Sequence, residues 1–235
     1  MNILGRELPP PFDEFWERFR SEIPVASEQI ESGHSVVFGD QGYDLSAPEL
    51  PAWAALPDDD LAYHVAHELF HIVQRQRGYP KTVRGPQYPP DSVEARIGAD
   101  LEEMIFHPPL EELLRVEMGF LNDFIRQRML HGSLSGVAGS PVPEYGTPWF
   151  TTWAIRYCEL QIILNANEWA ELETVFRERS PQVARLGEEM TAIVNDIGWG
   201  TREQAIEALI GVRDSLGLQV NQIVLVMDPL SGEII

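Results

Sequence analysis

Several residue types and motifs on which common protein functions depend are rare or absent in this sequence. It contains one cysteine, Cys158, which excludes an intramolecular disulfide and a zinc site built from several thiolates. No GxxxxGK[ST] or GxGxxG run is present, so no phosphate-binding loop is predicted. The serine in VAGSPVP lacks the GxSxG context of a nucleophile. Disulfide, nucleotide and serine-nucleophile chemistry are therefore not expected.

Basic residues are scarce as well. The chain has 17 Lys and Arg residues against 37 Asp and Glu, which gives 17 − 37 = −20 at pH 7. Such a surplus repels phosphate backbones and anionic membranes. We expect no nucleic-acid or membrane partner, whereas a protein or peptide with a basic patch would be attracted. A negative surplus is also common on a surface that is simply solvated.

Long apolar runs are absent too. Residues 1–25 lack the basic start and continuous apolar run of an export signal, and no later stretch reaches the roughly 18 apolar residues of a membrane span. We therefore expect a cytoplasmic protein. Its composition, 44% hydrophobic and 23% charged, is typical of a globular chain with a buried core.

The periodicity of apolar residues predicts an α+β fold dominated by helices, with a small N-terminal sheet. HSVVFGD and GYDLS alternate apolar and polar residues as strands do, and QIVLVMDPLSGEII predicts a strand, a turn and a short return strand. The proline-rich segment 80–90 is expected to be an irregular loop. Helices are expected to begin at the aspartates 58–60, near Asp91 or Ser92 with an end before His107, over residues 110–130, and after Thr147, Ser180 and Thr201.

The motif HELFH, residues 67–71, lies in the segment LAYHVAHELFHIVQRQRG. On a helix with about 100° per residue, His71 lies about 40° from His67, His64 about 60° and Glu68 about 100°. These four polar residues share one face, and an apolar stripe on the opposite face can bury the helix. The stripe consists of Ala62, Val65, Ala66, Leu69, Phe70, Ile72 and Val73.

Two histidines four residues apart can reach one metal ion. Zinc binds neutral imidazole nitrogens at about 2.0 to 2.1 Å in a tetrahedral arrangement, which suits His67 and His71. Glu68 would point beside the ion, where its carboxylate can accept a proton from a metal-bound water as the general base of peptide hydrolysis. His64 is expected to be a supporting or surface residue.

The third ligand is expected from a carboxylate on the next helix, SVEARIGADLEEMIFHP. Glu94 borders the buried stripe of that helix, and Gly98 leaves room for close helix packing or for the ion. Glu102 competes with Glu94, whereas Asp100 and Glu103 fall farther from the stripe and are expected to be solvated. The sequence thus leaves Glu94 or Glu102 as the third ligand, with Glu94 favoured.

A glutamate that follows HELFH after 23 residues (94 − 71) at the start of a proline-terminated helix resembles the gluzincin pattern, in particular the IrrE/ImmA type of metallopeptidase. The likeness covers residues 60–108. It departs from that family at Phe70, where the family commonly has Gly, and at Ala95-Arg96, where the family has Ala-Asn. The resemblance implies a cytoplasmic peptidase that cuts a specific protein partner, often a transcriptional repressor.

A second likeness covers the segment before the motif. VVFGDQGYDLS followed by LAYHVAHELFHIVQRQRG is similar to the HExxH domain associated with extracellular contractile injection systems. Both resemblances agree on His67, Glu68 and His71, and neither covers the helical remainder. We expect a zincin-like metal-binding core over residues 1–108, followed by a helical part over 109–235 that packs on it and ends in a strand or hairpin, or else one single domain.

The sequence therefore favours a zinc-dependent metallopeptidase that acts on a protein or peptide substrate. In this hypothesis His67, His71 and Glu94 bind Zn²⁺, and Glu68 is the catalytic base. The alternative is an inactive zincin-like module that binds a protein and keeps a structural or regulatory metal. A third interpretation is that no metal binds and the motif is only a polar helix face.

Overall fold

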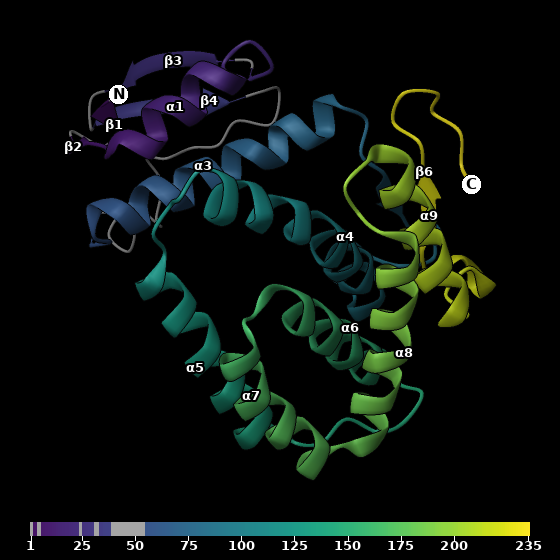
Figure 1. The fold of residues 1–235 in the computed structure, drawn as a ribbon. Helices are drawn as coiled ribbons and strands as arrows, with labels where there is room; N and C mark the ends of the chain where they lie inside the picture. The colour runs from purple at the N-terminus through teal and green to yellow at the C-terminus, as the bar shows by residue number, and fades with distance from the viewer. Residues whose placement is uncertain (1, 4–5, 24, 31–32, 39–54) are drawn as a thin grey trace. The chain divides into compact units, whose positions relative to one another are not determined.

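The computed structural model describes residues 2–3, 6–23, 25–30, 33–38 and 55–235, and Figure 1 shows their helices and strands. The chain packs into two compact units. The first unit is formed by Met1–Gln76 and Leu110–Arg128, and the second by Arg77–Pro109 and Met129–Ile235. Each unit is assembled from two separate stretches of the chain. These units therefore differ from the expected parts 1–108 and 109–235, which are each one continuous stretch.

Within its described residues, the first unit combines helices with two short antiparallel strand pairs. Strand β1 (Asn2–Ile3) pairs with β2 (Arg6–Glu7), and β3 (Val25–Ile30) pairs with β4 (Gly33–Phe38). The second pair confirms the strand predicted in HSVVFGD, whereas GYDLS, residues 42–46, lies outside the described residues. The helices are α1 (Pro10–Phe19), α3 (Asp58–Gln76) and the π-helix η1 (Glu112–Glu117).

The core of the first unit forms where α1 packs against α3. Phe12, Phe15 and Phe19 recur every three or four residues, so they share one face of α1 and are buried. The ring of Phe19 meets Phe70 of α3 edge-on, with centroids 5.4 Å apart. The apolar stripe of α3 is therefore buried in this core, and the histidines lie on its opposite, polar face.

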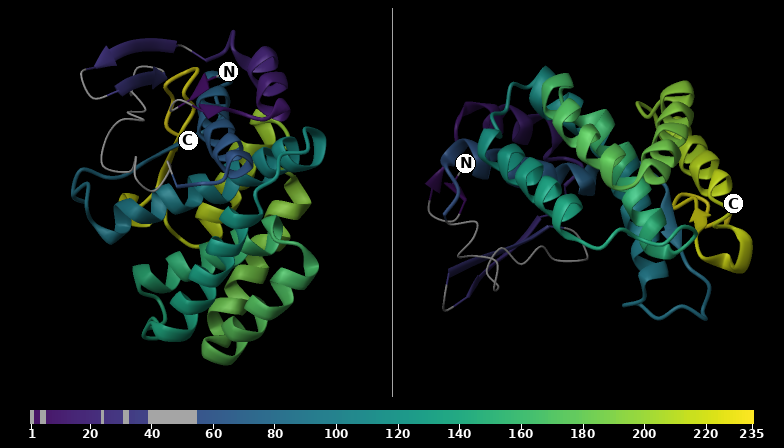
Figure 2. Two further views of the ribbon diagram at one scale, coloured as in Figure 1. Left: turned by 90° about the vertical axis from the view of Figure 1, so that its left-hand side faces the viewer. Right: turned by 90° about the horizontal axis from the view of Figure 1, so that it is seen from below.

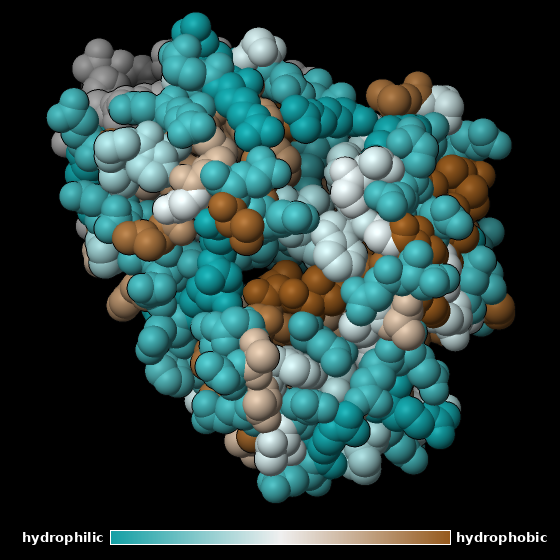
Figure 3. Space-filling model, viewed as in Figure 1, coloured by the Kyte–Doolittle hydropathy of each residue, from teal (hydrophilic) through white to brown (hydrophobic). Residues whose placement is uncertain are grey.

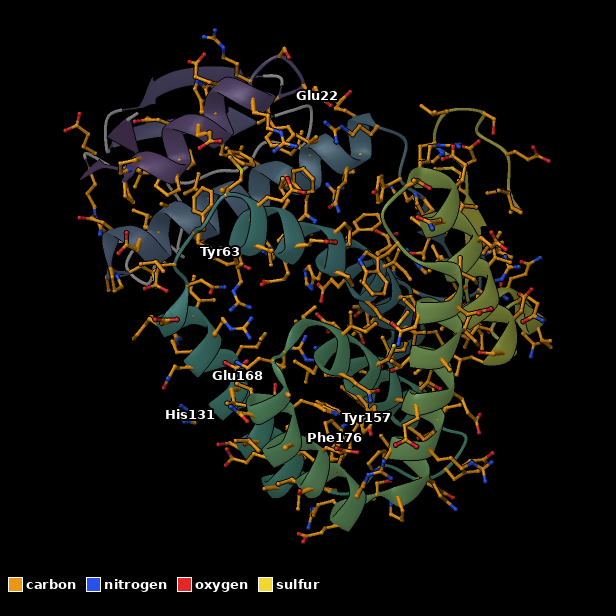
Figure 4. The ribbon with its side chains drawn as sticks, viewed as in Figure 1. Glu22, Tyr63, His131, Tyr157, Glu168 and Phe176 are labelled. Carbon is orange, nitrogen blue, oxygen red and sulfur yellow. The ribbon has the colours of Figure 1, made fainter. Side chains whose placement is uncertain are left out.

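The second unit is a helical assembly with one small strand pair. Helix α8 (Pro181–Ile197) packs against α6 (Pro148–Ile163), α7 (Ala166–Arg179) and α9 (Arg202–Ser215), which Figure 2 shows from two further directions. Tyr157 of α6 and Phe176 of α7, both labelled in Figure 4, meet with ring centroids 5.2 Å apart. Strand β5 (Lys81–Val83) pairs antiparallel with β6 (Leu225–Met227), next to the short 3-10 helix η2 (Val220–Gln222).

Helix α4 (Val93–Glu111) and helix α5 (Asp123–Gly139) each run through both units. The expected end of α4 before His107 was wrong, because Pro108 and Pro109 lie inside the helix. Proline removes a backbone hydrogen bond there. Burial of Leu110 and Leu114 in the first core favours continuation of the helix past that defect.

Two other expectations about single elements were wrong. The expected helix over 110–130 is interrupted between η1 and α5, where Gly119 takes a positive φ of 73°. The segment 80–90 is not wholly irregular, because its first residues form β5, whose Thr82 and Val83 are β-branched and suit a strand. Neither error changes the fold class.

The fold class itself is confirmed as α+β, dominated by helices and with small sheets. Within the described residues, the helices include none that is both long and apolar enough to cross a membrane. The face drawn in Figure 3 is largely hydrophilic, in keeping with the charged composition.

Candidate metal centre

Helix α3 carries the HELFH motif in the orientation that its sequence predicts. It begins at the aspartates 58–60, whose charges favour a helix N-terminus, and ends before Gly78, which has a positive φ of 77°. His64, His67, Glu68 and His71 are only half-buried. All seven residues of the predicted apolar stripe are buried: Ala62, Val65, Ala66, Leu69, Phe70, Ile72 and Val73.

The imidazole rings of His67 and His71 converge. Their Nε2 atoms lie 3.1 Å apart, and the two rings are nearly perpendicular, at 86°. Both side chains belong to a group that could hold a metal ion. Two Zn–N bonds of about 2.0 to 2.1 Å span a 3.1 Å separation at an N–Zn–N angle of about 100°, which is near tetrahedral. The pair therefore fits one zinc ion.

The other nitrogen of each ring fixes its tautomer. Nδ1 of His71 lies 3.1 Å from Oε1 of Gln74, a buried amide oxygen that can only accept, so Nδ1 carries the hydrogen. Nδ1 of His67 lies 3.4 Å from the hydroxyl of Tyr63. That hydroxyl donates its hydrogen to Oε1 of Glu111, so its oxygen accepts from His67. In the neutral rings, the lone pairs then lie on the two Nε2 atoms.

This arrangement has an electrostatic consequence. Two nitrogen lone pairs 3.1 Å apart repel each other unless a proton or a cation lies between them. The hydrogen bonds made by Nδ1 are those that histidine ligands of metals make to supporting acceptors. The supports of His67 and His71 therefore favour a cation between the two Nε2 atoms.

Glu111 anchors the support of His67. Its carboxylate faces two guanidinium groups, with Oε2 3.7 Å from Nη1 of Arg115 and 3.6 Å from Nη1 of Arg126. Burial raises the pKa of Tyr63 well above its usual value, and the charge of Glu111 adds to the effect. The phenol therefore stays protonated and can donate at any physiological pH. Tyr63 is labelled on α3 in Figure 4.

The two remaining polar residues of this face differ in chemistry. Burial lowers the pKa of His64 to about 4, so the ring is neutral near pH 7. Glu68 follows His67 directly on α3 and is half-buried, which leaves its carboxylate partly accessible to water. The role of Glu68 as catalytic base stays a prediction.

The carboxylates considered as the third ligand lie on α4, in the second unit. Glu94 is half-buried in the first turn of the helix, after Ser92, whose hydroxyl accepts from the amide of Ala95 at 3.1 Å. Glu102 is engaged elsewhere, because its Oε1 accepts from the hydroxyl of Thr82 at 2.7 Å and from the Thr82 amide. These bonds disfavour Glu102 as a metal ligand. The role of Glu94 as the third ligand stays a prediction.

Gly98 provides space for a strand and not for an ion. A Cβ atom on Gly98 would lie 2.8 Å from Oγ1 of Thr82, so β5 packs tightly against α4 at this point. Asp100 was expected to be solvated, which was wrong: its side chain is only 19% exposed.

The supporting residues Gln74 and Glu111 were missed by reasoning from the sequence. Gln74 lies three residues after His71, a spacing at which helical side chains meet, so a hydrogen bond to the ring could have been anticipated. Glu111 is 48 residues from Tyr63 along the chain. It lies beyond the expected end of its helix, and no local pattern identifies it.

No protein-family model, curated protein or solved structure matches the chain.

Proposed function

We propose that the protein is a zinc-dependent metallopeptidase whose ion is bound by His67 and His71. The observation that carries the proposal is the pair of Nε2 atoms 3.1 Å apart, each on a ring whose Nδ1 is held by another side chain. That geometry supports a cation site and disfavours a merely polar helix face. Zinc is favoured because imidazole nitrogen is among its preferred ligands.

A zinc ion at this site would supply a Lewis acid that polarises a peptide carbonyl and makes water more acidic. The protein's own residues would do the rest. Gln74 and Tyr63 hold the two rings in orientation, and Glu68 accepts a proton on its carboxylate. Glu94 is proposed as the third protein ligand, as the likeness to the IrrE/ImmA peptidases implies. The substrate would be a protein or peptide of the cytoplasm.

Metal content tests the site first. Protein purified without an affinity tag is expected to contain about one zinc per chain, and His67→Ala is expected to lose it. Glu94→Ala is expected to bind zinc more weakly. His131→Ala is the matched control, because His131 is an exposed histidine on α5 and its loss is expected to leave the zinc content unchanged. Wild-type protein without zinc after incubation with zinc salt would overturn the proposal.

Turnover is tested separately with Glu68→Gln, which keeps the shape of the side chain and removes its basicity. A mixture of short peptides of varied sequence is incubated with zinc-loaded protein, and the products are identified by mass spectrometry. We expect Glu68→Gln to keep its zinc and to cleave at least about 100-fold more slowly, because general bases contribute about that much. Glu112→Gln, an exposed glutamate of η1, serves as the control.

The same two measurements identify the alternative function. A zinc content of one, with no peptide cleaved by wild-type protein or by Glu112→Gln, would favour a protein-binding module with a structural metal. Equal cleavage by wild-type protein and Glu68→Gln would contradict the assignment of Glu68 as the base.

A further inference from the structure

The second unit contains a cavity of about 400 Å³ that the proposed peptidase chemistry does not use. Residues of α4, α5 and α6 line it, and they include both charged and aromatic side chains. This mixture is typical of ligand sites, in which a few polar groups fix a ligand against apolar walls. The charged residues are Arg96, Asp100, Glu103, Arg156 and Glu159, and Trp149 and Trp153 provide the aromatic wall.

One of the three carboxylates is already neutralised by the protein. Oε1 of Glu159 accepts from Nδ1 of His107 at 2.6 Å, and Oε2 accepts from Nη1 of Arg156 at 2.6 Å. Burial alone would raise the pKa of Glu159, but the hydrogen bond from His107 and the charge of Arg156 hold it at about 2. Arg156 and Glu159 thus cancel each other's charge within the cavity.

The other two carboxylates are poorly compensated. Asp100 is 3.8 Å from Nε of Arg96, and its buried Oδ2 makes no hydrogen bond within the described part of the chain. Arg96 is 63% exposed, and its guanidinium carbon lies 5.8 Å from the centre of the Trp149 ring. Glu103 forms no ion pair with any residue that the structure describes. The cavity therefore carries a negative surplus.

The same cavity holds a second buried polar atom. Oγ1 of Thr152, on α6, faces the carboxylate of Asp100 but makes no hydrogen bond of standard geometry within the described residues. A buried acceptor or hydroxyl without a partner costs about 1 to 3 kcal/mol, and native structures contain few of them. Asp100 and Thr152 both line the cavity, so a ligand with several N–H donors could satisfy both.

A second cavity of about 440 Å³ adjoins the first. The two share Ser140, Trp149 and Trp153, and the proline-rich loop after α5 lines the second. Its walls are mainly apolar, with Val142 among them. The tryptophans thus lie between an acidic compartment and an apolar one.

We propose that the two cavities together bind a small organic cation, namely an ammonium group that carries an apolar or aromatic arm. The ammonium group donates to Oδ2 of Asp100 in the acidic compartment, and the arm packs on Trp149 and Trp153. An anion would meet the poorly compensated carboxylates of Asp100 and Glu103 there. A bare metal ion would leave the tryptophan walls unused.

Calorimetric titration of the full chain with 2-phenylethylamine at pH 7.5 tests the proposal. Two ligands with the same ring serve as controls, 2-phenylethanol without a charge and phenylacetate with a negative one. We expect saturable binding of the amine only. Removing one charge-assisted hydrogen bond typically weakens binding by about tenfold or more. Asp100→Asn is therefore expected to lower the affinity for the amine by that factor.

Two further variants locate the site. Trp149→Ala is expected to bind the amine more weakly. Glu207→Gln changes an exposed glutamate of α9 and is expected to bind the amine as tightly as wild-type protein does. Glu103→Gln, at an exposed position of the cavity rim, replaces Asp100→Asn should that variant fail to fold. Binding of the alcohol as tight as that of the amine would overturn the proposal, as would unchanged binding in the folded carboxylate variant. Neither result depends on zinc or peptide cleavage, so this proposal and the proposed function fail separately.

Discussion

At the residue scale, Gln74 holds the ring of His71 by accepting from Nδ1 at 3.1 Å. It is only 1% exposed, so water cannot readily replace it as the acceptor. We expect Gln74→Leu to weaken zinc binding by about 10- to 100-fold, as removal of a supporting hydrogen bond typically does. The dissociation constant is measured by competition with a chromogenic chelator.

The matched variant Gln74→Glu keeps an oxygen acceptor at the same place. It is expected to bind zinc within a few-fold of wild-type protein, which separates orientation of the ring from packing of the helix. Equal zinc affinities of wild-type protein and a folded Gln74→Leu would show that Gln74 does not position His71.

The candidate site could be predicted from the sequence only where it depends on one helix. The spacing of His67, Glu68 and His71 determines their common face, because α-helix geometry is local. The support from Glu111 could not be predicted, since it depends on packing between segments 48 residues apart. Asp100 was misjudged for the same reason: helical periodicity shows which face it occupies and not what lies against that face.

At the element scale, the packing of α8 on α6 depends on Gly187. A Cβ atom on Gly187 would lie 2.6 Å from Cγ of Tyr157, whose ring is completely buried. The ring cannot move without disturbing its contacts with Phe176 and Trp169. We expect Gly187→Ala to lower the free energy of unfolding by about 1 to 3 kcal/mol, although alanine favours helices, because overpacking outweighs propensity. Urea denaturation measures the change.

Gly132 provides the control for this prediction. It lies inside α5, and a Cβ atom there would meet nothing within 4 Å among the described residues. Gly132→Ala is expected to stabilise by up to about 1 kcal/mol through helix propensity alone. The same sign of change in both variants would contradict the importance of the close contact at Gly187.

The elements predicted best are those whose ends are encoded locally. Thr201 and Gln204 form the expected capping box, and Thr147 caps α6 through its hydroxyl. The elements predicted worst depend on distant partners. Strand β5 exists because it pairs with β6, more than 140 residues later in the chain (225 − 83 = 142), and local residue preferences do not reveal that partner.

At the scale of the whole molecule, the two units have separate hydrophobic cores. Phe15 belongs to the core of the first unit and Phe176 to that of the second, and each is at most 1% exposed. The continuous helices α4 and α5 contribute to both units. Stability should therefore differ between the units, because local unfolding follows the contacts that each core provides.

Phe15→Leu and Phe176→Leu test this with hydrogen exchange read by mass spectrometry. Each substitution removes buried ring volume and is expected to destabilise its own unit by about 1 to 3 kcal/mol. We expect Phe15→Leu to speed exchange in α1 and α3 and to leave α7 and α8 protected, with the reverse for Phe176→Leu. Both variants should affect α4 and α5, because these helices run through both units. Equal acceleration everywhere in either variant would instead mean that the chain unfolds as one cooperative body.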